Sequence, residues 1–76
     1  MNIDNNWVIL ATGNGVVLQK HAGSLSLVYS ATPPTGSEDQ FSVNQSEPIV
    51  LPTVAGKNIY VSSHAGFASI TTEELL

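Results

Sequence analysis

The sequence contains no cysteine and only two basic residues. The lack of cysteine excludes a disulfide framework and every zinc site built on thiolates. A chain of 76 residues buries only about 60% of its unfolded surface, so its own core gives marginal stability. Small domains without disulfides or a structural metal often gain the rest by association, and we therefore expect a homo-oligomer.

Charge of either sign is scarce, at 11% of residues, and the formal net charge is −4. A typical soluble domain has about 25% charged residues. An isolated sheet needs charged residues on its edges to avoid pairing with neighbours, yet Lys20 is the only lysine within an expected strand. We infer that partner chains cover much of the surface. A neutral, soluble monomer is the alternative.

Two classes of partner are disfavoured by what is missing. Lys20 and Lys57 are the only permanent cations, too few for the several phosphate contacts of nucleic-acid binding, so we expect no direct nucleic-acid partner. The longest apolar run, Trp7 to Ala11, is far short of the ~20 residues of a membrane-spanning helix. Met1 to Asn6 has neither the basic nor the apolar region of a signal peptide, so we expect synthesis in a cytoplasm and no membrane partner.

The chain does contain short runs of strand-forming residues, separated by Gly, Pro, Asn and Ser. This spacing predicts an all-β fold, a small antiparallel β-sandwich or barrel of about seven short strands, rich in hairpins. We expect one domain over residues 1–76, with an N-terminal arm at 1–6 and a C-terminal tail at 73–76. The expected strands are Trp7–Thr12, Val16–Lys20, Ser24–Ser30, Gln40–Asn44, Ile49–Leu51, Asn58–Ser63 and Phe67–Thr72.

The tripeptide His-Ala-Gly occurs twice, at His21–Gly23 and at His64–Gly66. Each copy lies between two strand-forming runs, which predicts a β-hairpin at both places. Other turns are expected at Gly13–Gly15 and at Ala55–Lys57. The repeat is either an internal duplication or a pair of similar turns.

The two histidines, His21 and His64, pose the main chemical question. A zinc site needs three or four ligands, and the chain has no third histidine and no cysteine. A pH switch at an interface is one alternative, because histidine titrates near neutrality. Polar turn residues are the simpler interpretation. Ser63 precedes His64, but neighbours in sequence need not have the spatial arrangement of a catalytic serine and histidine. No Gly-x-Ser-x-Gly elbow is present. We predict no enzyme activity, no metal and no cofactor.

Strand alternation leaves several apolar side chains opposite the expected core. If Ile59 and Val61 point inward, Tyr60 points outward, and the run Trp7–Thr12 is apolar on both faces. Such faces need cover from another chain. The candidate interface residues are Trp7, Val8, Leu10, Val50, Tyr60 and Phe67. A second interpretation is a sugar-binding platform, with Trp7 or Tyr60 exposed beside Asn5, Asn6 and Asn14.

Several segments taken together suggest a family. They include the Pro33-Pro34 loop, Ile49-Val50-Leu51, the run Gly56-Lys57-Asn58-Ile59-Tyr60-Val61 and the closing Gly66-Phe67-Ala68-Ser69-Ile70. With Trp7 and Phe41, this pattern resembles small β-sandwich virion proteins of tailed bacteriophages. Those proteins are head decoration (cement) proteins or small tail and fibre components.

The resemblance implies a structural role. It implies a symmetric homo-oligomer, commonly a trimer, docked on the exterior of the phage head and in contact with other virion proteins such as the major capsid protein. A tail or fibre component, or a carbohydrate-binding adhesin module, is the alternative. It also implies a virion location after synthesis in the host bacterial cytoplasm, and it brings no catalytic residues.

Overall fold

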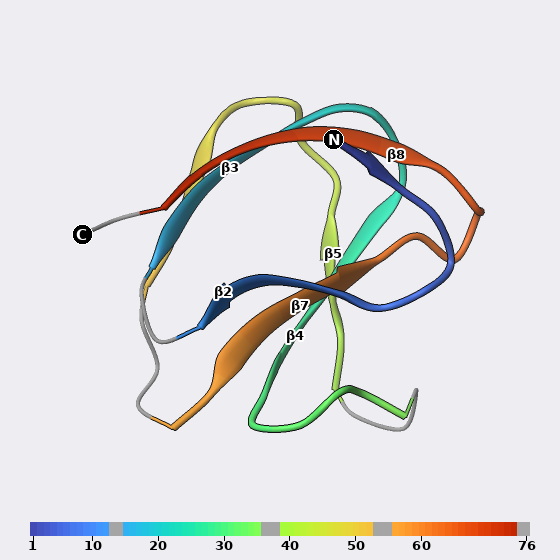
Figure 1. Ribbon diagram of the computed structural model, residues 1–76. Helices are drawn as coiled ribbons and strands as arrows, with labels where there is room; N and C mark the ends of the chain where they lie inside the picture. The colour runs from blue at the N-terminus through green and yellow to red at the C-terminus, as the bar shows by residue number, and fades with distance from the viewer. Residues whose placement is uncertain (13–14, 36–38, 53–55, 75–76) are drawn as a thin grey trace.

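The computed structural model describes residues 1–12, 15–35, 39–52 and 56–74, and these residues form eight β-strands and no helix (Figure 1). The all-β fold predicted from the sequence is therefore confirmed. The strands are β1 (Asn2–Ile3), β2 (Val8–Thr12), β3 (Val16–Gly23), β4 (Leu25–Ser30), β5 (Phe41–Val43), β6 (Ile49–Leu51), β7 (Asn58–Ser62) and β8 (Ala68–Glu74).

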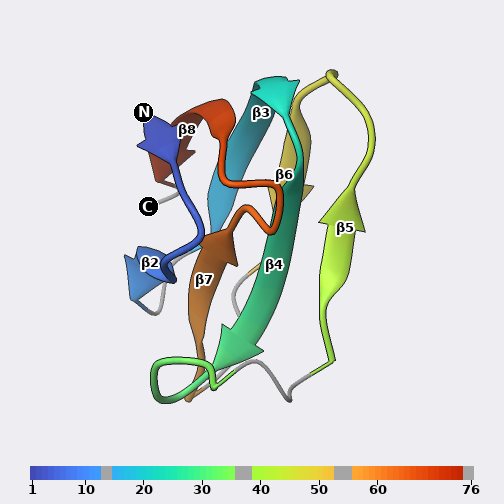
Figure 2. The same ribbon diagram turned by 90° about the vertical axis from the view of Figure 1, so that its right-hand side faces the viewer.

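The strands form two four-stranded antiparallel sheets, in the orders β1-β8-β3-β6 and β2-β7-β4-β5. The pairs β1·β8, β2·β7, β3·β6 and β4·β5 are the successive rungs of one folded-back ribbon. The ribbon wraps so that β8 also pairs with β3, and β7 with β4. This is the topology of the jelly roll, an eight-stranded double-sheet fold. Figure 2 shows the β2-β7-β4-β5 sheet with β5 at one margin.

The hydrophobic core lies between the two sheets and follows the period-two alternation of the strands. Leu25 and Leu27 of β4 face the other sheet, and Val16 and Leu18 of β3 face them in return; all four side chains are buried. Burying each such side chain contributes about 1.5–3 kcal/mol. The clean alternation of β3 and β4 is what makes these strands recognisable in the sequence.

Both ends of the described chain belong to a sheet. The Met1 amino group donates to the Ile70 carbonyl at 2.9 Å, and the Ile70 amide donates back to the Met1 carbonyl at 2.9 Å. The expected N-terminal arm therefore contains strand β1, which is too short to show alternation in sequence. The tail expected at 73–76 is wrong in part, because Glu73 and Glu74 pair with β3. Residues 75–76 lie outside the described part.

The two His-Ala-Gly copies do not form hairpins, which corrects the prediction. His21–Gly23 belongs to β3 and includes a β-bulge, and the chain then crosses to β4 in the other sheet. His64–Gly66 joins β7 to β8, again in different sheets. Alternation identifies strands but says nothing about which sheet each strand joins. The turns expected at Gly13–Gly15 and Ala55–Lys57 include residues outside the described part.

Ser63 holds the two crossings together at one end of the sandwich. Its hydroxyl donates to the Phe67 carbonyl at 2.8 Å, accepts from the Phe67 amide at 3.1 Å and lies 3.3 Å from the Ser24 hydroxyl. Its amide donates to the Asp4 carbonyl at 2.8 Å, in the connection from β1 to β2. One fully buried serine therefore links three connections between the sheets.

Candidate functional site

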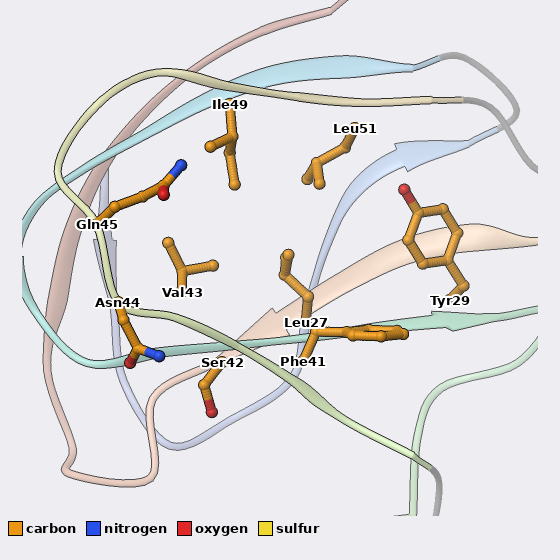
Figure 3. A pocket seen from close by; sticks show the side chains of 9 residues that line it. All are labelled: Leu27, Tyr29, Phe41, Ser42, Val43, Asn44, Gln45, Ile49 and Leu51. Carbon is orange, nitrogen blue, oxygen red and sulfur yellow. The ribbon is translucent and has the colours of Figure 1, made fainter.

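The open side of the sandwich is where β5 and β6 end their respective sheets. Each strand has three residues and pairs with a single described strand. An apolar groove of about 440 Å³ lies between them. Ile49 and Leu51 point into it from β6, and Leu27, Phe41 and Val43 form the opposite wall (Figure 3). Part of the core is therefore reachable from solvent on this side.

Polar groups occur only toward the margins of the groove. Ser42 points away from it, and Gln45 lies at the end nearest Ile49. The Tyr29 hydroxyl donates to the Pro52 carbonyl at 3.2 Å, and burial raises the pKa of Tyr29 above its usual 10.0. Among the residues that the structure describes, no lysine, aspartate or glutamate lines the groove. A ligand or partner group that enters it must be uncharged and mainly apolar.

Two hydrogen bonds from β3 hold the segment that closes one end of the groove. Gln19 Nε2 donates to the Ser46 carbonyl at 3.1 Å, and Lys20 Nζ donates to the Val43 carbonyl at 3.0 Å. Lys20 is one of the two lysines in the chain. Its ammonium group therefore anchors the end of β5.

Two large apolar side chains on the short strands are strongly exposed. Phe41 of β5 is 60% exposed and Val50 of β6 is 65% exposed. Phe41 lies on the groove side of its sheet, the side that faces the core. It is exposed because β5 is the last strand of its sheet. Sequence alternation does not distinguish an edge strand from a central one, so Phe41 was missing from the expected interface.

Apart from Trp7, which is half-buried, the expected interface residues fall into two groups. Val50 and Phe67 are exposed. Val8 and Leu10 pack against the core cluster, so they do not face outward, and Tyr60 is only 7% exposed, so it is not left uncovered. Tyr60 is on the outer face, as alternation predicts, but its register places it between Ile9 of β2 and Val28 of β4. Neighbours on both sides bury it.

Trp7 is half-buried and contacts His64. Their ring centroids lie 6.4 Å apart with the planes at 88°, an edge-to-face arrangement that aromatic pairs prefer. His64 Nε2 donates to Gln40 Oε1 at 2.6 Å. The imidazole thus bridges the residue before β2 and the residue before β5. His21 is elsewhere, with its Nε2 2.6 Å from Thr71 Oγ1.

Neither the metal site nor the sugar platform considered from the sequence is assembled. The described residues contain no group of three His, Cys, Asp or Glu side chains placed to hold a metal. Asn6 is engaged with both carboxylate oxygens of Asp4, and Tyr60 is buried. Asn14 lies outside the described residues. The structure therefore does not bring Trp7, Tyr60 and the asparagines together as an exposed platform.

Comparisons with family profiles, with curated proteins and with solved structures found no match to this chain. Among the described residues there is also no helix with the length and apolar character to cross a membrane. The groove, its margins and the fold are therefore the features that bear on function.

Proposed function

We propose that this protein is a structural virion protein of a tailed bacteriophage, acting through assembly and without catalysis, metal or cofactor. In this proposal it forms a homo-oligomer that docks on the head exterior against other virion proteins such as the major capsid protein. The residue pattern resembles that of small virion proteins. The jelly-roll topology adds a fold-level analogy, because viral capsid domains and lectins both use it.

The open side of the sandwich is the observation that carries the proposal. A domain of this size has a small core, yet its apolar groove is left accessible beside the exposed Phe41, and Val50 is exposed on the opposite face of β6. Apolar surface of this kind on a charge-poor protein is typical of an interface. A partner that binds only the folded state at a hundredfold excess over Kd adds about 2.7 kcal/mol of stability. Assembly would thus compensate for the small core.

The proposal places the contact with the phage head on the two exposed residues of the predicted interface. Val50 and Phe67 are the members of that set whose side chains are exposed and can contact the capsid. Only 11% of the residues are charged, so the contact would depend on apolar burial and be insensitive to salt. A tail or fibre location differs from this only in the particle that is bound.

The test is binding to phage heads that lack this protein. Purified protein is mixed with heads at micromolar concentration, the heads are sedimented, and copies per head are counted by mass spectrometry. We expect saturation at a fixed copy number and binding roughly tenfold weaker for Val50→Lys, a change of about 1.4 kcal/mol. Thr32→Lys, on an exposed loop residue, is the matched charge control. Absence of saturable binding overturns the proposal, and binding to tails alone overturns the head location.

A further inference from the structure

The four edges of the two sheets differ in how they resist pairing with another strand. Natural edges are blocked by very short strands, bulges, prolines or charges. β1 has two residues, β2 carries a register shift between Ile9 and Ala11, and β6 lies between Pro48 and Pro52. β5 is also short, with three residues, and Lys20 of β3 donates to its Val43 carbonyl, but it differs in the other respects: from Gln40 to Gln45 there is no proline and no charged residue, and its register with β4 is regular.

This least protected edge coincides with the incomplete side of the core. Phe41 is on β5, lines the groove and is 60% exposed. Figure 2 shows β5 at the margin of its sheet, and it is the last strand of that sheet in the described part of the chain. A strand added beside β5 would extend the backbone ladder, and its side chains on the same face would lie over the groove opening.

We propose that this added strand is β5 of a second copy, paired antiparallel about a two-fold axis at Ser42. The inference rests on the proposed function only in expecting self-association. In this register Phe41 lies opposite the partner's Val43, so each Phe41 covers the groove opening of the other copy. The two sheets join into one continuous sheet in the order β2-β7-β4-β5-β5-β4-β7-β2. The interface is isologous, which gives a closed dimer.

Charge favours this edge for contact between identical copies. Each copy has a net charge of −4, so contact is opposed wherever acids face each other. The segment from Gln40 to Ser46 contains none, and the two-fold register places Asp39 opposite the partner's Gln45. A segment without charged residues of its own also matches the groove, whose described lining residues are uncharged. The contact specifies a two-fold pair where the family resemblance implies a trimer.

A single introduced cysteine tests the register. The chain has no cysteine, so Ser42→Cys gives one thiol per copy. Directly opposed residues of an antiparallel pair have Cα atoms about 4.5–5.5 Å apart, and a disulfide spans about 4.4–6.8 Å. We expect copper-phenanthroline oxidation to convert Ser42→Cys to a covalent dimer at least tenfold faster than Val50→Cys. Val50 is the matched control, as the exposed middle residue of the other three-residue edge strand. Equal rates overturn the proposal.

Sedimentation velocity tests the contact without any thiol. We expect the unmodified protein to have the mass of a dimer, Phe41→Lys to shift to the monomer, and Val50→Lys to remain dimeric, with circular dichroism showing that all are folded. A wild-type monomer or trimer overturns the inference, as does a dimeric Phe41→Lys. None of these measurements uses phage particles, so failure to bind heads would refute the proposed function and leave the dimer standing.

Discussion

The two copies of His-Ala-Gly perform the same task in very different surroundings. Both carry the chain from one sheet to the other, and both end in a glycine with positive φ, 81° at Gly23 and 91° at Gly66. A Cβ at Gly23 would lie 2.2 Å from the Phe67 carbonyl oxygen, whereas Gly66 has nothing within 4 Å. An identical tripeptide therefore has a shared backbone requirement, and the neighbouring elements decide what each side chain does.

The sharpest test of this difference is Gly23→Ala. The methyl group adds about 1–2 kcal/mol for the left-handed backbone and about 1–3 kcal/mol for overlap with the Phe67 backbone. We expect a loss of about 3 kcal/mol or more in urea denaturation. Total stability for a chain of this length is about 4–11 kcal/mol, so the variant is expected to lose a large fraction of its free energy of unfolding. A loss below about 1 kcal/mol would contradict the crowding at this crossing.

His64→Ala is expected to have the next largest effect. It removes the edge-to-face contact with Trp7 and the hydrogen bond to Gln40, each worth about 0.5–1.5 kcal/mol. We expect a loss of about 2 kcal/mol and a red-shifted emission from Trp7, the only tryptophan. Unchanged emission would show that the imidazole does not cover the indole.

Gly66→Ala isolates the backbone requirement without the crowding. We expect a loss of about 1 kcal/mol, because only the positive φ is strained. Gly66→Asn should cost less than Gly66→Ala, since asparagine tolerates this region, while Gly23→Asn should be as damaging as Gly23→Ala. Equal losses of stability for Gly23→Ala and Gly66→Ala would contradict the difference in crowding between the two crossings.

His21→Ala should have the smallest effect of the series. His21 is exposed and contacts the Thr71 hydroxyl on the neighbouring strand. Exposed substitutions of this kind usually change stability by less than about 0.5 kcal/mol. Urea denaturation beside His64→Ala gives the comparison directly. A loss equal to that of His64→Ala would mean that the two imidazoles contribute equally to the free energy of unfolding.

The sequence predicts the strands well because their alternation is local. Ile49–Leu51 has the expected bounds, and β4 differs from its expectation only in starting at Leu25. What local patterns cannot show is how strands are distributed between sheets. That distribution turned both expected hairpins into crossings, buried Tyr60 in the middle of a sheet and exposed Phe41 at an edge. The candidate groove is formed by β5 and β6 with β4 behind them, so it could not be found before the topology was known.

The pairing of β1 with β8 has a consequence for how fast the protein reaches its native state. The Met1–Ile70 hydrogen bonds join residues 69 positions apart, and the other rungs of the ribbon are also formed between distant segments. Chains dominated by non-local contacts fold in about milliseconds to seconds, because loop-closure entropy is lost before the contacts form. During that interval the apolar segments, β5 with its least protected edge among them, are open to neighbouring chains. The same edge that we propose for a native dimer is then the one most exposed to aggregation while the sandwich is closing.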